Sequence, residues 1–360
     1  MKTLYINGRY LSQVVTGVQR YAHEVVAAWD ADLAGGLIDP KRYAIEVIAP
    51  RDVLALPDYK CIRVSRSRTN GRFWEQVELP LRTKGGLLFS PYAAAPVFKF
   101  RHAVTIHDAG VRATPQQYSR LFRTYYTVVY KLLGIGCRRI FTVSQFSKDE
   151  LGRYFSIPAH KVSVVPPGCD YLAGVTPDSR ILQKFNLRPK QFILGVSSRS
   201  PIKNFNGLAS AWRLLAQKDI PLAIAGKASE RIFAHSDSAP QQEVKWLGYV
   251  SDQELRALYE NAALFVYPSF YEGFGLPPME AMSCGCPVLV ARSSALPETC
   301  GDGALYCDPS SACEIAEKMA YVLNHPEVSK DLQRRGPQRA QEFTMDKTAS
   351  LLWSELKDFL

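Results

Sequence analysis

The sequence predicts an α/β protein made of two similar halves, each built around a parallel sheet. Short apolar strands alternate with amphipathic helical stretches along both halves, a pattern typical of parallel sheets covered by helices. Between the halves lies the segment PPGCDYLAGVTPDSR, whose Pro, Gly and Asp content indicates a linker near residues 166–188. A chain of 360 residues is long enough for two domains that each bury a core.

The first half is predicted to hold seven strands and three helices. Short runs rich in Ile, Val, Leu and Phe indicate buried strands, and apolar residues at helical spacing indicate helices. The predicted strands cover residues 3–6, 44–48, 62–64, 87–89, 103–106, 140–143 and 162–165. The predicted helices cover residues 18–33, 115–133 and 146–155.

The second half repeats the alternation and then ends in helices alone. Its strands are predicted at residues 192–196, 222–225, 244–246, 264–267 and 288–290, and its helices at 205–216, 252–261, 278–283 and 312–324. Two further helical stretches, at residues 328–343 and 345–359, have no strand between them. We therefore expect an N-terminal domain at 1–170, a C-terminal domain at 171–340, and a helix at 341–360 that returns to the N-terminal domain. Small ligands favour clefts between domains.

The positive charge of the chain is concentrated in its first half. Residues 1–180 hold 25 Lys and Arg against 14 Asp and Glu, whereas residues 181–360 hold 19 against 20. A basic half suggests an anionic partner such as a membrane surface, although a solvated basic surface fits equally well. No nucleic-acid-binding motif accompanies the charge, so we expect no nucleic acid partner.

Other bulk features favour a cytoplasmic protein without a metal site. No apolar run approaches the roughly 18 residues of a membrane span, and MKTLYINGRY does not resemble a signal peptide. The eight cysteines show no zinc-like spacing, and no Asp-x-Asp metal signature is recognised. We expect reduced cysteines and no metal or other cofactor.

The segment YEGFGLPPMEAM at residues 271–282 carries the strongest chemical signal. It follows an apolar strand, contains two glycines that loosen the backbone, and begins a helix at a pair of prolines. The start of a helix offers free N–H groups and a partial positive charge, which suits phosphate oxygens. Glu272 and Glu280 can accept hydrogen bonds from sugar or ribose hydroxyls. A plain crossover with solvated glutamates is the alternative, which the loop and helix start disfavour.

Two further polar residues follow strands at the edge where open α/β sheets bind ligands. His107 and Asp108 come directly after the strand at 103–106. Lys203 follows the first strand of the second half and precedes a helix, where a cation is unfavourable unless an anion is bound. Lys203 is therefore a candidate ligand for a diphosphate.

Taken together, these motifs resemble the retaining glycosyltransferases of family 4, which have the GT-B fold. The resemblance covers nearly the whole chain and includes the two-glutamate element, SCGCPVLVARSSALPETCGDGALYCDP after it, TIHD at 105–108, FTVSQFSKDEL at 141–151 and TGVQRY at 16–21. Within the family, the chain is most similar to bacterial mannosyl- and rhamnosyltransferases of O-antigen or capsule synthesis. The implied fold is two Rossmann-like α/β/α domains that face each other across a cleft.

The resemblance implies roles for residues of the C-terminal domain. Glu280 would bind the ribose hydroxyls and Glu272 the transferred sugar, while Lys203 would contact the diphosphate. The backbone N–H groups of Phe274, Gly275 and Leu276 would face the diphosphate or the sugar. Many relatives have an arginine five or six residues before the lysine; this chain has serines there, and Arg199 lies four before it.

The resemblance also implies roles for residues of the N-terminal domain. Gly17 follows the first strand in a loop where relatives often have two glycines, and we assign it to the donor site. His107 would contact the donor sugar near the reacting centre. Arg20 and Asp108 would serve the acceptor, although a structural salt bridge is an equal alternative for Arg20.

The expected reaction moves a hexose from a nucleoside diphosphate sugar to an acceptor hydroxyl with retention of configuration. Retention would proceed by front-face attack, with the diphosphate helping to deprotonate the acceptor. GDP-mannose is the first choice of donor, and UDP- and dTDP-sugars remain alternatives. The acceptor is expected to be a lipid-linked saccharide at the inner face of the membrane. A UDP-N-acetylglucosamine 2-epimerase of the same fold and a non-enzymatic binder of anionic polymers are the rival classes.

Overall fold

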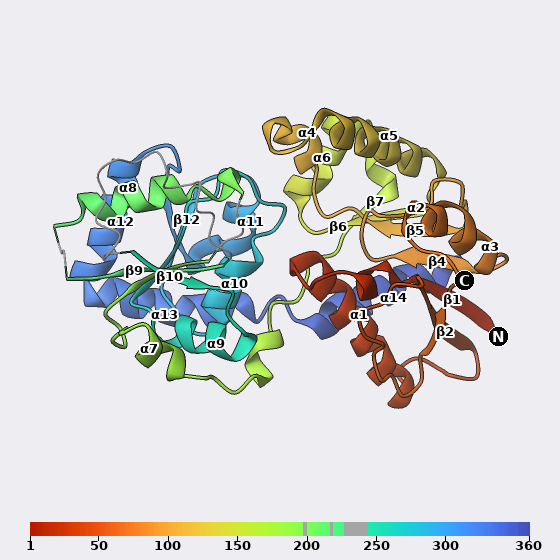
Figure 1. Cartoon of the computed structure of the whole chain (residues 1–360), viewed down its shortest axis with the longest axis horizontal. Coiled ribbons are helices and arrows are strands. Elements are labelled where there is room, and N and C mark those ends of the chain that lie inside the picture. The colour runs from red at the N-terminus through yellow and green to blue at the C-terminus, as the bar shows by residue number, and fades with distance from the viewer. Residues whose placement is uncertain (197–199, 217–218, 227–243) are drawn as a thin grey trace. The chain divides into compact units, whose positions relative to one another are not determined.

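The chain forms two compact units (Figure 1). The computed structural model describes residues 1–196, 200–216, 219–226 and 244–360. Unit 1 comprises Met1–Gly168 and Thr344–Leu360, and unit 2 comprises Cys169–Phe343. Unit 1 thus contains the segment that follows all of unit 2 in the chain.

Unit 1 is built on a seven-stranded sheet in which every pairing is parallel. The strand order is β3-β2-β1-β4-β5-β6-β7, so the order reverses between β1 and β4. The strands are β1 (Lys2–Asn7), β2 (Tyr43–Ala49), β3 (Arg63–Arg66), β4 (Leu87–Ser90), β5 (His102–Thr105), β6 (Arg139–Thr142) and β7 (Val162–Val164).

Helices cover both faces of this sheet. One face carries α1 (Gly17–Ala34) and α14 (Met345–Leu356), which pack against each other (Figure 1). The other face carries α4 (Gly110–Ala113), α5 (Arg120–Gly136) and α6 (Gln145–Phe155). The remaining elements are η1 (Gly8–Ser12), α2 (Gly71–Phe73), η2 (Trp74–Glu78), α3 (Leu79–Arg82), η3 (Pro115–Gln117), η4 (Ala159–Lys161) and η9 (Lys357–Phe359).

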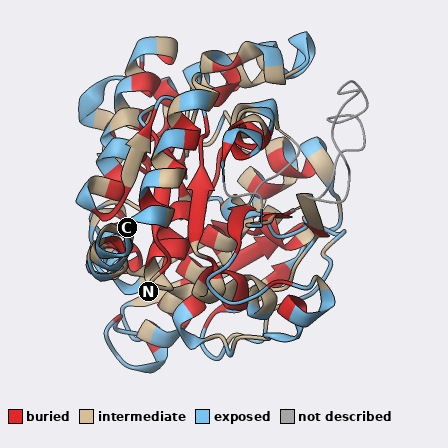
Figure 2. Ribbon diagram, turned by 90° about the vertical axis from the view of Figure 1, so that its left-hand side faces the viewer, coloured by how far each residue is buried: buried red, intermediate tan, exposed pale blue. Residues whose placement is uncertain are grey.

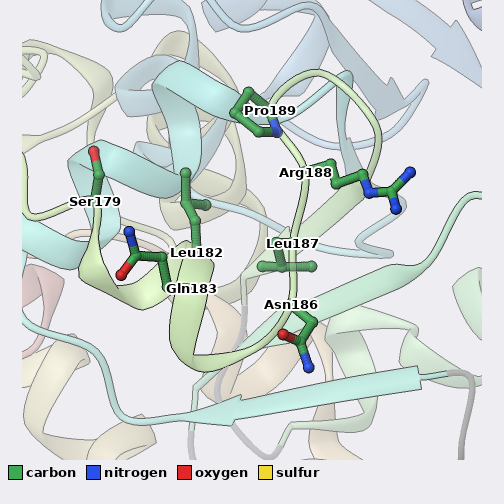
Figure 3. A pocket seen from close by; sticks show the side chains of 7 residues that line it. All are labelled: Ser179, Leu182, Gln183, Asn186, Leu187, Arg188 and Pro189. Atoms are coloured by element: carbon green, nitrogen blue, oxygen red, sulfur yellow. The ribbon is translucent and has the colours of Figure 1, made fainter.

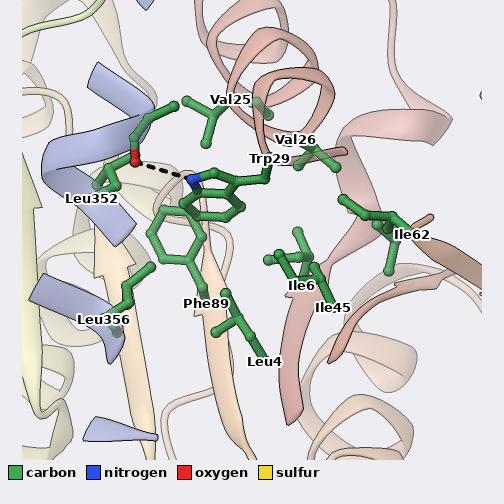
Figure 4. Packing of buried hydrophobic residues seen from close by; sticks show 14 of the residues in the cluster. Leu4, Ile6, Val25, Val26, Trp29, Ile45, Ile62, Phe89, Leu352 and Leu356 are labelled. Carbon is green, nitrogen blue, oxygen red and sulfur yellow. Dashed lines mark hydrogen bonds between the residues drawn. The ribbon is translucent and has the colours of Figure 1, made fainter. Parts of the chain in front are cut away.

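The largest core of unit 1 lies between the sheet and the α1–α14 pair. Trp29 of α1 is fully buried, and its Nε1 donates a 3.0 Å hydrogen bond to the Ala349 carbonyl of α14 (Figure 4). Its ring contacts Phe89 of β4, and Leu352 and Leu356 of α14 are buried in the same cluster. The last helix therefore completes this core.

Unit 2 is built on a six-stranded parallel sheet of order β10-β9-β8-β11-β12-β13, with its reversal between β8 and β11. Its four inner strands are buried at the centre of the unit (Figure 2), and the two edge strands, β10 and β13, are partly buried. The strands are β8 (Ile193–Val196), β9 (Leu222–Ala225), β10 (Val244–Gly248), β11 (Leu264–Tyr267), β12 (Val288–Ala291) and β13 (Leu305–Cys307). The described helices are η5 (Tyr171–Gly174), α7 (Arg180–Lys184), η6 (Pro201–Lys203), α8 (Phe205–Leu214), α9 (Asp252–Asn261), α10 (Leu276–Ser283), α11 (Leu296–Cys300), η8 (Gly301–Gly303), α12 (Ala312–Asn324) and α13 (Pro326–Ala340).

Several elements differ from the sequence prediction, among them the short helices α4, α7 and α11, which were not predicted. The helix predicted at 115–133 is divided, because the Ser119 hydroxyl accepts a hydrogen bond from the Phe122 N–H and so begins α5 at Arg120. Strand β13 was not predicted, since three residues are too few for a periodic signal. The helical segment from α2 to α3 was also missed.

Both sheets have a point where the strand order reverses. At such a point the connections from two adjacent strands leave toward opposite faces, and open α/β sheets bind ligands there, beyond the carboxyl ends of the strands. Residues that follow β1 and β4 in unit 1, or β8 and β11 in unit 2, therefore occupy the favoured binding positions.

Two neighbouring leucines of α14 test its contribution to unit 1. Leu352 is fully buried and Leu351 is 48% exposed. Leu352→Ala should lower the free energy of unfolding by about 2–5 kcal/mol through lost burial and a residual cavity. Leu351→Ala should change it by no more than about 0.5 kcal/mol. Urea unfolding followed by circular dichroism measures both, and equal effects would contradict the packing described for α14.

Candidate active site

Two predicted site residues of unit 2 form a direct ion pair at the switch point of its sheet. The Lys203 Nζ lies 2.6 Å from Glu272 Oε1. The two side chains are only 21% and 10% exposed. Lys203 belongs to the connection after β8, and Glu272 to the connection after β11, so the pair spans the reversal of strand order.

Main-chain contacts between loops hold the pair together. The Ile202 carbonyl, next to Lys203, accepts hydrogen bonds from the Phe270 N–H at 2.8 Å and from the Ser269 hydroxyl at 3.2 Å. The Glu272 N–H donates to the Ser294 hydroxyl at 2.9 Å. Three loops, after β8, β11 and β12, are thereby joined where the ion pair lies.

Burial and the nearby charge together set the protonation of this pair. Burial alone would lower the pKa of Lys203, but the Glu272 carboxylate outweighs it and raises that pKa above its ordinary value. Tyr267 lies beside the pair, with its ring centre 5.4 Å from the Lys203 Nζ. Burial and the charge of Glu272 raise the pKa of Tyr267, so its hydroxyl stays neutral. The site therefore presents a charged lysine, and its cation remains at neutral pH.

The second predicted glutamate is fixed by two tyrosines. Glu280 lies within α10 and is 7% exposed. Its Oε1 accepts a 2.9 Å hydrogen bond from Tyr171, and its Oε2 accepts a 3.0 Å hydrogen bond from Tyr259. Burial and the charge of Glu280 raise the pKa of Tyr259, which keeps this donor protonated. The carboxylate is thus held in one orientation.

The helix start predicted to face a phosphate is shaped by a glycine and two prolines. Gly275 precedes α10 with φ of +95°, and a Cβ there would lie 2.6 Å from Leu296, so only glycine fits. Pro277 and Pro278 carry no N–H. The donors that the first turn can offer are therefore those of Gly275 and Leu276. The side chain of Phe274 contributes to packing, since its ring lies 5.4 Å from that of Phe343.

In unit 1, His107 lies just beyond the carboxyl end of β5. Its Nε2 is 3.2 Å from the Pro91 carbonyl, and its ring makes an edge contact with Tyr21 of α1. The surrounding protein atoms lower the pKa of His107 from 6.5 to about 4, so the imidazole is neutral at pH 7. Nε2 therefore carries the proton and donates it to the carbonyl.

The other predicted residues of unit 1 lie near His107 along the chain or on α1. The Asp108 Oδ1 accepts a 2.7 Å hydrogen bond from the Gly110 N–H. Gly17 is the exposed first residue of α1, after the capping residue Thr16. Arg20 lies one turn further on, where its charge lowers the pKa of His23, an effect second to burial. Tyr21 connects this turn to His107.

The predicted residues thus fall into two groups, one in each unit. In unit 2, Lys203 and Glu272 are in contact. Glu280 lies within α10, and Gly275 and Leu276 form the start of that helix. Arg199 lies outside the described residues. Sequence reasoning missed Tyr171, Tyr259 and Tyr267, whose partners are distant in the chain; only Tyr267, at the end of its strand, had a positional signal.

A surface hollow of unit 2 includes none of these residues. Its volume is about 690 Å³, and Figure 3 shows it between α7 and the turn that follows. It is lined by Ser179, Leu182, Gln183, Asn186, Leu187, Arg188 and Pro189. These residues precede β8, so the hollow lies at the amino end of that strand, opposite the edge where open α/β sheets bind ligands.

Two family profiles match the chain. The profile "Glycosyl transferases group 1" matches residues 178–339, and "Glycosyltransferase Family 4" matches residues 83–171. Among characterised relatives, O-antigen chain mannosyltransferase B of Escherichia coli is 31% identical over 256 residues, covering 68% of this chain and 67% of the relative. Serotype-specific mannosyltransferase WbdA of Escherichia coli is 30% identical over 226 residues, which are 59% of this chain but only 28% of that protein.

Solved structures share the fold over nearly the full chain. Sucrose-phosphate synthase of Thermosynechococcus elongatus superposes with a TM-score of 0.77 at 19% identity, covering 99% of this chain and 100% of the other. The Anabaena protein HepE, crystallised with UDP and glucose, superposes with a TM-score of 0.73 at 16% identity and the same coverage of both chains. These neighbours define the GT-B fold and confirm the predicted fold class. The chain belongs to glycosyltransferase family 4.

Two features of the described residues bear on a metal site and on a membrane span. No group of three or more His, Cys, Asp or Glu side chains in the described ranges is arranged to hold a metal ion. Within the same ranges, every helix is too short or too polar to cross a bilayer.

The neutral state of His107 predicts a pH dependence of stability. In the unfolded chain this histidine gains a proton below about pH 6.5, whereas the folded protein resists protonation until about pH 4. The free energy of unfolding should therefore fall as the pH drops from 6.5 to 4, and His102, whose pKa burial lowers to about 3, adds to the fall. Urea unfolding at several pH values should show a shallower decline for His107→Gln than for the wild type. Parallel profiles would contradict the assignment.

Proposed function

We propose that this chain transfers a hexose, mannose from GDP-mannose as the first choice, to a saccharide acceptor with retention of anomeric configuration. The observation that carries the proposal is the Lys203–Glu272 pair at the switch point of unit 2, close to the start of α10. The names of the relatives support the sugar, since they include O-antigen chain mannosyltransferases of Escherichia coli and Salmonella typhimurium.

In this proposal unit 2 binds the donor. An ammonium group has three hydrogen-bond donors; Glu272 accepts one of them from Lys203, and the Tyr267 hydroxyl is a second partner. The remaining donor can hold a diphosphate oxygen, together with the N–H groups of Gly275 and Leu276 and the positive end of α10. Glu272 would accept hydrogen bonds from hydroxyls of the transferred sugar. Glu280, oriented by its two tyrosines, would bind the ribose hydroxyls.

The reaction does not require a strong general acid, because the leaving diphosphate is already a stable anion. What needs stabilising is the negative charge that grows on the diphosphate as the sugar becomes positive. Lys203 and the start of α10 oppose that charge without a metal ion or other cofactor. Glu272 is a weak nucleophile because its oxygen is bonded to the Lys203 ammonium at 2.6 Å. We therefore favour front-face attack, in which the leaving diphosphate receives the acceptor's proton, over a covalent glycosyl-enzyme.

Unit 1 would bind the acceptor and complete the reacting centre. His107, neutral at pH 7 with its Nε2 proton on the Pro91 carbonyl, would accept a hydrogen bond from the donor sugar at Nδ1 without adding positive charge. Asp108 and Arg20 would serve the acceptor, and Gly17 would let the donor approach the backbone at the start of α1.

A nucleotide screen tests the donor site directly. GDP should raise the thermal midpoint more than UDP, dTDP or ADP at equal concentration. Glu280→Ala should weaken GDP binding about tenfold or more in calorimetry, because hydrogen bonds to a charged group are lost. Glu260→Gln is the matched control, since Glu260 lies in the same unit but pairs with Arg256 on the surface of α9. Unchanged GDP affinity in Glu280→Ala would contradict the ribose role.

The same preparation tests the reaction. With GDP-mannose, a saccharide acceptor and EDTA, the expected products are GDP and an α-mannoside, identified by NMR of the anomeric proton. A β product would refute retention, and loss of activity in EDTA would refute the metal-free mechanism. Formation of an epimer of the donor sugar, or release of free UDP from UDP-N-acetylglucosamine without an acceptor, would favour the epimerase class.

We also propose that unit 1 associates with the inner face of the membrane through α5. Leu121, Val128, Leu132 and Ile135 recur at helical spacing on one side of this helix, and they are 82%, 51%, 38% and 75% exposed. Arg120 and Lys131 lie on the same helix, to one side of this stripe, and the first half of the chain carries the excess positive charge. An exposed apolar stripe beside basic residues suits an anionic lipid surface.

Vesicle sedimentation tests this surface. Binding to vesicles that contain phosphatidylglycerol should fall steeply between 50 and 500 mM salt, because the Debye length shortens from roughly 14 to 4 Å. Replacing Leu121 and Ile135 by Glu should abolish binding at low salt. Leu54→Glu is the control, since Leu54 is 67% exposed in unit 1 but lies outside α5. Equal binding by both variants would exclude α5 as the contact.

A further inference from the structure

The switch point of unit 1 holds a second cluster of polar and aromatic side chains, which the sequence did not indicate. Arg9 lies two residues after β1, and Tyr92 lies two residues after β4. Glu75 comes from η2, and Tyr125 and Tyr126 come from α5. The cluster therefore occupies the same kind of position in unit 1 that Lys203 and Glu272 occupy in unit 2.

An ion pair lies at the centre of this cluster. The Arg9 Nη1 is 3.2 Å from Glu75 Oε2, and the Glu75 side chain is only 5% exposed. The Gln76 amide donates a 2.9 Å hydrogen bond to the other carboxylate oxygen of Glu75. Burial raises the pKa of Glu75, and the charge of Arg9 opposes that rise. A buried carboxylate of this kind is costly to fold, since desolvation offsets much of what its partner contributes.

The backbone around Glu75 is also unusual. The five residues of η2, Trp74–Glu78, form a π-helical turn between the short α-helical segments α2 and α3. Single π turns within α-helical segments are rare and frequently occur at functional sites. Here the widened turn carries the buried carboxylate.

The Tyr92 hydroxyl is buried without a hydrogen-bond partner among the described residues. Tyr92 is 7% exposed, and no described atom bonds to its Oη. The charges of Arg9 and Glu75 act on this hydroxyl, which places it beside the ion pair. Buried hydroxyls almost always have a partner, so an unpaired one next to charged groups points to a bound molecule.

Aromatic rings border the cluster on α5. Tyr125 and Tyr126 are partly exposed, and their ring centres lie 5.2 Å apart. The Arg72 guanidinium covers Tyr125 at 3.9 Å from the ring centre. Tyr126 continues into Tyr130, at 5.9 Å, whose pKa is raised by burial and by the charge of Asp108. The rings therefore lead from Glu75 toward the predicted acceptor residue Asp108.

We propose that Arg9, Glu75, Tyr92 and the Tyr125–Tyr126 pair form a subsite for one neutral sugar ring of the acceptor. The carboxylate and guanidinium would bind adjacent hydroxyls, the Tyr92 hydroxyl would gain its missing partner, and a tyrosine ring would pack on the apolar face of the sugar. This inference rests on the proposed function, because it assumes that the saccharide bound in unit 1 is the acceptor.

The charges of the cluster favour a sugar over the phosphate of a lipid-linked acceptor. Arg9 is already neutralised by Glu75 at 3.2 Å, and the Arg72 guanidinium lies over a ring. A phosphate placed against the Tyr92 hydroxyl would meet the buried Glu75 carboxylate, and like charges at this depth repel strongly. Hydroxyl groups meet no such penalty.

Saturation-transfer NMR on the full chain tests the subsite. The probes are methyl glycosides of mannose, rhamnose, glucose and N-acetylglucosamine, with inorganic pyrophosphate as a competing anion. At least one glycoside should receive saturation from the protein's aromatic protons. Tyr92→Phe should weaken its binding about five- to tenfold, the effect of one lost hydrogen bond. Because the hydroxyl has no partner among the described residues, this variant should keep the thermal midpoint of the wild type. Glu75→Gln should weaken binding further, and Tyr43→Phe, a partly buried tyrosine that packs on Trp353, is the control.

Each outcome decides the proposal. Absence of glycoside binding, equal binding by Tyr92→Phe and the wild type, or displacement of the glycoside by pyrophosphate would overturn it. A fall in the thermal midpoint of Tyr92→Phe would also count against it, since the hydroxyl would then serve the fold. GDP binding, measured on the same variants, should be unchanged. Loss of glycoside binding in Tyr92→Phe without any GDP binding by the wild type would support the subsite while refuting the proposed donor.

Discussion

A parallel sheet whose strand order reverses in the middle imposes the arrangement of everything functional in this chain. On either side of the reversal, successive connections leave toward opposite faces, and the carboxyl ends of two adjacent strands are left uncovered by either. Each unit has one such point, between β1 and β4 and between β8 and β11. In both units, charged side chains of opposite sign meet there, Arg9 with Glu75 and Lys203 with Glu272. Neither ion pair belongs to the apolar cores that pack against the two sheets.

The two pairs differ in how they are held, and that difference matches the ligands proposed for them. Lys203 and Glu272 come from loops joined by main-chain hydrogen bonds, so the ammonium group is fixed while a donor remains for a phosphate. Glu75 is held by Arg9 and by an amide, within a turn bordered by tyrosine rings. A buried carboxylate and guanidinium bordered by tyrosine rings suit the hydroxyls and the apolar face of a sugar, and an ammonium group beside the start of a helix suits an anion.

Local sequence was sufficient where a motif and its contacts lie within one loop and the helix after it. The strand, the glycines and the prolines of YEGFGLPPMEAM are adjacent, and they form β11, the turn at Gly275 and α10. It was insufficient where a partner is distant. Tyr171 lies 109 residues from Glu280, and no sequence pattern predicts that its hydroxyl donates a hydrogen bond to this carboxylate. Glu75 was missed for a related reason: its segment carries no apolar period, and a π turn has no sequence signature comparable to a cap or a turn. Strand order, which brings Arg9 near Tyr92, emerges only once the sheet is assembled.

The position of α14 has a consequence for biosynthesis. Ribosomes release the chain from its amino end, and domains generally fold as units during synthesis. All of unit 2 emerges before Leu352 and Leu356, which complete the core around Trp29. Unit 1 is synthesised first but cannot complete its core until α14 has been made. Until then an apolar surface formed by α1 and the sheet stays uncovered, although unit 2 can already fold. Chaperone engagement during translation would be directed at unit 1.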